Sequence, residues 1–207
     1  MVPEGYLETR KHVEFSKYVR AALGLHPKFA VSHYSSMKLF EELVDQTTYI
    51  GEVGLDYSIN NGNDRRIQKE IFERILSTIQ GKNKILTIHS VQSAKDVLDL
   101  LVKYNHKKAI FHWYSGDCET LEEIIRRGYY LSINPAMIRN NNGKDIISNI
   151  PKNRVLTETD GPFVKVNNKV ARPKDVEYIE AYLSKIWNLS TIEVSELIKE
   201  NFTSILT

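Results

Sequence analysis

Two carboxylates and two imidazoles in this chain occupy positions from which they could hold a metal ion. Glu52 interrupts the apolar stretch Tyr49–Leu55, and an ionised carboxylate in a buried strand is costly unless it is paired or bound to a cation. His89, His112 and Asp160 each stand at the C-terminal end of another apolar stretch. The alternative for Glu52 is an ordinary salt bridge at a strand end.

These residue types together suit a hydrolytic metal site. Imidazole and carboxylate groups hold zinc, manganese or magnesium, and a carboxylate can bridge two ions. Hydrolysis needs this mixture because open coordination positions then admit a water and a substrate oxygen. Taken singly, His89 or His112 would be an ordinary core histidine, and Asp160 a turn residue before Gly161–Pro162. Those structural alternatives stay open for each residue.

Strand and helix patterns alternate along the chain and would position these side chains. Continuous apolar runs predict six buried strands: Tyr18–Leu25, Tyr49–Tyr57, Ile85–His89, Ala109–Trp113, Tyr129–Ile133 and Arg154–Asp160. The expected helices cover Glu8–Ser16, Ser35–Asp45, Asn63–Gln80, Ala94–Tyr104, Cys118–Arg127, Lys144–Ile150, Pro173–Trp187 and Thr191–Asn201, with a flexible loop at Asn140–Gly143. Apolar strands that alternate with helices indicate a parallel sheet covered by helices. In a parallel α/β barrel the C-terminal strand ends form the ligand-binding face, so the polar groups would share one pocket.

The composition fits one ordinary domain spanning residues 1–207, with 42% hydrophobic and 26% charged residues. A formal net charge of +2 is too small to indicate a nucleic-acid binder, so local groups would have to hold such a partner. The single cysteine, Cys118, excludes an intramolecular disulfide and a cysteine-based zinc cluster. With no apolar run of membrane-spanning length, we expect a cytoplasmic protein without a membrane partner.

Five motifs, in this order and at these spacings, resemble the TatD family of metal-dependent deoxyribonucleases. They are Gly-Leu-His-Pro at 24–27, Gly-Glu-Val-Gly-Leu-Asp-Tyr at 51–57, Thr-Ile-His-Ser at 87–90, Phe-His-Trp-Tyr-Ser-Gly at 111–116 and Thr-Glu-Thr-Asp-Gly-Pro at 157–162. Weaker agreement continues to the C-terminus. Within that family, the sequences Leu-Gly-Leu-His-Pro at 23–27 and His-Trp-Tyr-Ser-Gly at 112–116 also resemble the TatD-like component of the Qat anti-phage defence system.

The resemblance implies a TIM-type (β/α) barrel of the metal-dependent hydrolase kind and hydrolysis of DNA phosphodiester bonds, often as an exonuclease. It implies that Glu52 bridges two divalent ions (Zn, Mn or Mg) and that His89 and His112 bind one of them. Asp160 would bind the other ion and orient the attacking water, so Glu52 and Asp160 would be the catalytic residues.

Three further residues are expected to contact substrate. His26 matches a family position beside the active site, which suggests a contact to a substrate phosphate or support of a metal ligand. Tyr57 and Trp113 stand next to the expected ligands, where an aromatic face could stack on a base of single-stranded DNA. Packing at the rim of the site is the alternative for both aromatic residues.

One departure from the family pattern concerns the start of the barrel. Family members begin with a strand that carries His-x-His, and this chain contains no such motif. We therefore expect a barrel that lacks its first one or two β/α units, with about six of eight strands and one ion instead of two. A fragment or alternative start would explain the difference. Otherwise the polar N-terminus could fold over the gap, or a second copy or another chain could cover the open barrel edge.

The leading hypothesis is thus a metal-dependent deoxyribonuclease that acts on single-stranded DNA or a DNA end, with other defence-cassette proteins as partners. One alternative is a metal-dependent hydrolase of another substrate, such as an amide or lactone, because barrels of this type serve many reactions. The other is a catalytically impaired subunit that acts as a partner protein.

Overall fold

The computed structural model describes residues 1–13, 15–58 and 62–207. Its chain divides into two compact units, residues 1–110 and 111–207, which are described in turn. The expectation of a single domain over residues 1–207 stays a prediction. Glu14, inside the expected helix Glu8–Ser16, lies outside the described residues. No helix within the described ranges is long and apolar enough to cross a bilayer.

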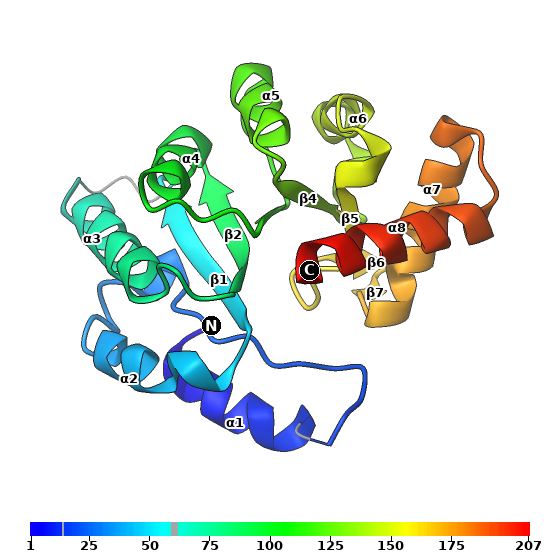
Figure 1. Cartoon of the computed structure of the whole chain (residues 1–207). Coiled ribbons are helices and arrows are strands. Elements are labelled where there is room, and N and C mark those ends of the chain that lie inside the picture. Colours follow the sequence, from blue (N-terminus) through cyan, green and yellow to red (C-terminus); the bar gives the residue numbers. More distant parts are fainter. Residues whose placement is uncertain (14, 59–61) are drawn as a thin grey trace. The chain divides into compact units, whose positions relative to one another are not determined.

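The first unit is built around two parallel strands (Figure 1). Its elements are α1 (Pro3–Val13), η1 (Pro27–Phe29), α2 (Ser36–Leu43), η2 (Val44–Gln46), β1 (Tyr49–Asp56), α3 (Gly62–Thr78), β2 (Ile85–Val91) and α4 (Ala94–Lys103). β1 pairs with β2 from Tyr49 opposite Ile85 to Asp56 opposite Val91, and α3 and α4 pack on these strands. The register shifts between Ile50 and Val53, so Glu52 lies within an irregularity of the ladder. Such irregularities re-aim a side chain next to a functional site.

Burial of β1 explains why its sequence is apolar on both faces. Ile50, Val53 and Leu55 are fully buried, and the apolar face of α3 covers the strand pair. Gly54 has a φ of +136°, and a Cβ there would lie 2.1 Å from the carbonyl oxygen of His89. Glycine is therefore required where β1 and β2 approach each other beside Glu52.

The expected strand Tyr18–Leu25 is wrong. Only Leu23 makes a bridge, to Ile50, through hydrogen bonds with the backbones of Tyr49 and Gly51. Leu23 and Leu25 are buried, but the side chains of Tyr18 and Val19 are 88% and 51% exposed. A strand needs a neighbouring ladder along its length, and residues 18–22 have apolar composition without one in the described chain. Five of the six expected strands are thus present among the described residues, although Arg154–Asp160 is shorter than expected.

The second unit carries the remaining elements (Figure 1). β3 (Ala109–His112) contains the boundary between the units and precedes α5 (Cys118–Arg126), β4 (Tyr130–Ile133), η3 (Met137–Arg139), α6 (Asn141–Ser148), η4 (Lys152–Arg154) and β5 (Val155–Thr157). There follow β6 (Lys165–Val166), β7 (Lys169–Val170), η5 (Pro173–Val176), α7 (Glu177–Trp187) and α8 (Thr191–Leu206). β4 pairs in parallel with β5, with Leu131 opposite Val155. α8 packs against β5 and α7.

Two local features of the second unit differ from expectation. Asn140–Gly143 is not a loop: Asn140 is the N-cap of α6, and its side chain accepts a hydrogen bond from the Gly143 backbone at 2.7 Å. The antiparallel hairpin of β6 and β7 was not expected. Its turn residues, Asn167 and Asn168, have φ values of 51° and 62°, which asparagine tolerates better than most residues.

Candidate metal centre

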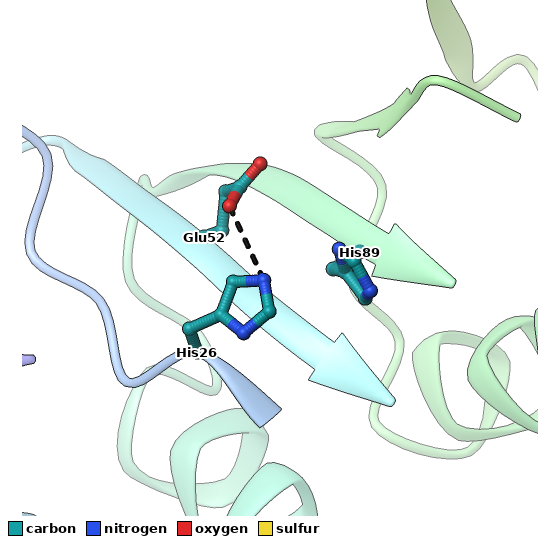
Figure 2. A group of neighbouring side chains, drawn as sticks. All are labelled: His26, Glu52 and His89. Atoms are coloured by element: carbon teal, nitrogen blue, oxygen red, sulfur yellow. Dashed lines mark ion pairs between the residues drawn. The ribbon is translucent and has the colours of Figure 1, made fainter. Parts of the chain in front are cut away.

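The first unit brings His26, Glu52 and His89 together at β1 and β2 (Figure 2). Each offers one ligand atom, and these atoms lie within 4.8 Å of one another. Nε2 of His26 lies 3.5 Å from Oε2 of Glu52, and the rings of His26 and His89 meet edge to face with centroids 4.4 Å apart. The spacing and the mixture of donors fit a divalent ion.

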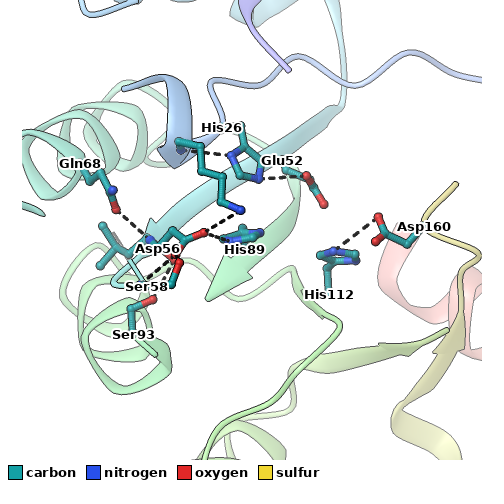
Figure 3. A network of polar contacts seen from close by, with 11 residues as sticks. His26, Glu52, Asp56, Ser58, Gln68, His89, Ser93, His112 and Asp160 are labelled. Atoms are coloured by element: carbon teal, nitrogen blue, oxygen red, sulfur yellow. Dashed lines mark hydrogen bonds and ion pairs between the residues drawn. The ribbon is translucent and has the colours of Figure 1, made fainter. Parts of the chain in front are cut away.

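Asp56, at the end of β1, fixes the orientation of His89 (Figure 3). The Asp56 side chain is fully buried, and its Oδ2 lies 2.9 Å from Nε2 of His89. Its Oδ1 accepts hydrogen bonds from the backbone and hydroxyl of Ser58, and Nζ of Lys28 lies 3.6 Å from Oδ2. Burial acts to raise the pKa of Asp56, but the hydrogen bonds from Ser58 and His89 outweigh it, and the pKa lies below its usual value.

This contact sets the tautomer of His89. An ionised carboxylate only accepts hydrogen bonds, so Nε2 of His89 carries a proton and donates it to Asp56. In the neutral ring the lone pair is then on Nδ1, which is the nitrogen that a metal would take. A carboxylate behind a ligating histidine is a recurrent feature of protein metal sites.

His26 has the same Nε2–H tautomer as His89, but a different contact sets it. Its Nδ1 accepts a hydrogen bond from the Lys28 backbone at 3.1 Å, because His26 caps η1. Burial, together with the nearby His89 ring, lowers the pKa of His26 to about 3, so the ring is neutral at pH 7. With Nδ1 as acceptor, the proton is on Nε2, which faces Glu52. His26 is therefore arranged as a hydrogen-bond donor at this site.

A second group of polar side chains lies in the second unit, around His112 at the end of β3. Nε2 of His112 lies 3.8 Å from Oδ1 of Asp160 (Figure 3). Nδ1 of His112 lies 2.7 Å from Oε2 of Glu158. The hydroxyl of Ser132 donates to Oε2 of Glu158, and the side-chain amide of Asn134 donates to Oε1 at 3.1 Å. Glu158 thus orients His112 as Asp56 orients His89, and Nε2 of His112 would be the ligand atom.

Two residues of this group, Asp160 and Trp113, have unusual backbone conformations. Asp160 has a φ of 49°, and its carbonyl oxygen accepts hydrogen bonds from the backbones of Phe163 and Val164. Trp113, directly after His112, has a φ of 40°. Positive φ is rare for a bulky residue, and such outliers cluster at functional sites.

The two aromatic residues expected to contact substrate are held by protein contacts. The Tyr57 hydroxyl donates to Oδ2 of Asp96 at 2.7 Å, and the Arg65 guanidinium lies over its ring. Trp113 packs against the buried cluster Val164, Val166 and Ala171. Both residues are half-buried. Their roles in stacking on a base stay predictions.

Two carboxylates that orient the histidines were not assigned that role from the sequence. For Asp56, four residues after Glu52, the sequence left two roles open: orienting a ligand or starting the turn after the strand. Glu158 was overlooked, although it stands directly after the apolar residues of β5. Its place at the end of an apolar run was the available signal, the same one that named His89 and His112.

Glu158→Gln is expected to weaken divalent-metal binding about 10- to 100-fold, because a glutamine amide cannot accept hydrogen bonds as the carboxylate does from His112, Ser132 and Asn134. Isothermal titration with Mn²⁺ measures the change. Glu119→Gln, an exposed change on α5, serves as the matched control. Equal metal affinity in the two variants would show that Glu158 has no orienting role.

The arrangement of the site and the fold define the class of protein. The chain matches the family model described as TatD related DNase over residues 4–207, and it belongs to that family. Its fold is similar to that of YJJV, a TatD homolog from Escherichia coli K12, with a TM-score of 0.85 at 20% identity over 99% of this chain and 82% of that one. A TatD family hydrolase from Entamoeba histolytica gives a TM-score of 0.81 at 18% identity, over 99% and 81%. The expected fold class, an α/β fold of the TIM-barrel type with parallel strands, is confirmed.

Relatives with curated names agree with this assignment. The chain is 24% identical over 202 residues to human deoxyribonuclease TATDN3, covering 90% of this chain and 74% of that protein. It is 27% identical over 199 residues to the uncharacterized metal-dependent hydrolase YabD of Bacillus subtilis, covering 91% and 78%. A putative deoxyribonuclease TATDN1 homolog from Vairimorpha ceranae is 31% identical to this chain over 162 residues. The match covers 78% of this chain but only 59% of the length of that relative.

Proposed function

We propose that this chain hydrolyses DNA phosphodiester bonds with divalent metal, for which Glu52 and His89 of the first unit and His112 and Asp160 of the second unit are ligands. The observation that carries the proposal is that a carboxylate holds one ring nitrogen of each proposed histidine ligand, Asp56 at His89 and Glu158 at His112. Membership of the TatD related DNase family and the names of the human and Bacillus relatives support the choice of reaction.

The residues of the chain divide the chemistry between them. A divalent ion bound there would polarise a phosphate oxygen and make a water a better nucleophile. Asp160 is the residue that we assign to orient the attacking water and to accept its proton at a carboxylate oxygen. Nε2–H of His26 is directed to the side of Glu52 and is available to donate to a non-bridging phosphate oxygen. Asp56 and Glu158 keep the two ligand imidazoles in the required tautomers.

The substrate, the cellular location and the biological role of the enzyme can be specified further as part of this proposal. We assign the enzyme to DNA ends or single strands, as an exonuclease of the cytoplasm. The sequences at residues 23–27 and 112–116 resemble the TatD-like component of the Qat system, and this supports a role in anti-phage defence beside other proteins of such a cassette. Zinc, manganese and magnesium all suit the donor set of imidazole and carboxylate.

Metal removal tests the proposal. Treatment with a chelator is expected to abolish hydrolysis of a labelled single-stranded oligonucleotide, and addition of Mn²⁺, Mg²⁺ or Zn²⁺ in turn should restore it with at least one ion. Parallel assays with an amide and a lactone substrate distinguish the reaction class. Hydrolysis that survives chelation, or activity confined to the amide or lactone, would overturn the proposal.

A further inference from the structure

The segment Lys165–Lys174 of the second unit concentrates positive charge. Its four basic residues are Lys165, Lys169, Arg172 and Lys174, and the segment contains no acidic residue. Removing these four from the 28 basic residues of the chain leaves 24 against 26 acidic ones, a formal net charge of −2. The small net charge of the whole protein therefore conceals a local cationic segment.

This cationic segment lines a pocket of about 550 Å³ between the β6–β7 hairpin, η5 and the start of α7. A volume of this size is in the range of small-ligand sites. Lys169, Arg172 and Lys174 contribute to the wall, and Val166 and Tyr178 supply apolar and aromatic surface. The pocket thus offers both charge for a phosphate and apolar surface for a sugar or base.

The basic side chains are available to an external anion. Within the described chain, none of the four forms an ion pair with a carboxylate at 4.0 Å or less. Asp175 is the acidic residue among those that line the pocket in the described chain, and its Oδ2 accepts a hydrogen bond from the Arg172 backbone at 2.7 Å. This carboxylate is therefore engaged in the start of η5.

The pocket is attached to the turn that holds Asp160. The backbone N–H of Ala171 donates a hydrogen bond to the carbonyl oxygen of Val164. The backbone N–H of Val164 in turn donates to the carbonyl oxygen of Asp160. A Cβ at Gly161 would lie 2.2 Å from the Ala171 carbonyl oxygen, so the hairpin and the turn are in close backbone contact. Asn167, at the hairpin turn, donates to the Tyr178 hydroxyl at 2.8 Å and ties β6–β7 to α7.

The distance between Asp160 and the basic residues that follow it suits a bound nucleic-acid strand. The five residue-to-residue steps from Asp160 to Lys165 span at most about 17 Å when the chain is fully extended. One strand of a duplex advances about 3.4 Å per nucleotide, so Lys165 lies within about five nucleotides of Asp160.

We propose that the Lys165–Lys174 pocket binds the phosphodiester backbone of the same DNA strand whose scissile phosphate is placed at Asp160. The inference rests on the proposed function and specifies its substrate as a strand several nucleotides long. Lysine and arginine contacts to phosphates provide affinity without reading sequence. The pocket would therefore favour strands over mononucleotides and leave the reaction at Asp160 to the metal-binding residues.

Binding of a fluorescein-labelled twelve-residue oligothymidine in the presence of a chelator tests this proposal separately from catalysis. Lys169→Ala/Lys174→Ala is expected to bind about 5- to 30-fold more weakly than the unchanged protein, for two lost phosphate contacts. The slope of log affinity against log salt should decrease in magnitude by about 1.4. Lys185→Ala/Lys199→Ala, which removes two exposed charges on α7 and α8, serves as the control and should bind normally.

The remaining arms identify the ligand and keep the two proposals distinguishable. Turnover of bis(4-nitrophenyl) phosphate should be the same in both double variants, which shows that the reaction centre is intact. Thymidine monophosphate and inorganic phosphate should compete poorly with the oligonucleotide. Equal oligonucleotide affinity in the two double variants would overturn the pocket assignment even if DNA is hydrolysed, and so would competition by free phosphate as strong as that by the strand.

Discussion

Asp160→Asn is expected to lower kcat for DNA hydrolysis by about 10²- to 10⁴-fold, the range for loss of a positioned proton acceptor. Asparagine keeps the size of the side chain and its ability to accept one hydrogen bond, but it cannot take a proton from water at neutral pH. The backbone turn should be retained, because asparagine tolerates the positive φ at this position. Steady-state kinetics with a labelled single strand and saturating Mn²⁺ measure the change.

Asp145→Asn provides the control for Asp160, because Asp145 is an exposed aspartate on α6 in the same unit. It should retain normal kcat. Circular dichroism of both variants checks that the fold is preserved. A kcat for Asp160→Asn within about twofold of the control would remove Asp160 from the catalytic residues.

Glu52→Gln is expected to abolish stabilisation of the protein by divalent metal. A ligand at 100 times its Kd stabilises a folded protein by about 2.7 kcal/mol, which appears as a rise in Tm. A divalent ion loses favourable hydration energy when it leaves water, and the negative charge of the Glu52 carboxylate offsets that loss. The neutral glutamine amide cannot do so. Without metal, Glu52→Gln should melt at or above the Tm of the unchanged protein, since a partly buried charge has been removed. Thermal melts with and without Mn²⁺ measure both effects.

The structural alternative for Glu52 gives the opposite pattern in these melts. If Glu52 served only to accept a hydrogen bond from Nε2–H of His26, its replacement would lower the Tm without metal, and Mn²⁺ would stabilise the variant as it does the unchanged protein. Glu42→Gln, an exposed change on α2 in the same unit, should behave as the unchanged protein under both conditions.

The alternation of strands and helices was predictable because burial of a parallel strand on both faces leaves a continuous apolar run. This was true of β1, in which Ile50, Val53 and Leu55 are fully buried. The same signal failed at Tyr18–Leu25, since apolar composition does not show whether a neighbouring strand is present to pair with it. The β6–β7 hairpin was missed because its strands have two residues each, too few for a periodicity.

Strand ends predicted His89, His112 and Asp160 as ligands, and a carboxylate inside an apolar strand predicted Glu52. The pairing of each histidine with its carboxylate was not predictable in this way. His89 meets Asp56 across 33 residues of sequence, and His112 meets Glu158 across 46. A single sequence shows which residues end a strand, but not which carboxylate faces which ring nitrogen, because packing and strand register decide that. The tautomers of His26 and His89 likewise depend on contacts that only coordinates provide.

A crystal structure of the protein soaked in Mn²⁺, with the ion located by anomalous scattering, tests the central claim most directly. We expect a peak about 2.0–2.3 Å from a carboxylate oxygen of Glu52 and from Nδ1 of His89, while Nε2 of His89 keeps its hydrogen bond to Asp56. Absence of a peak at Glu52 and His89, at a Mn²⁺ concentration that supports hydrolysis, would contradict the assignment of this centre.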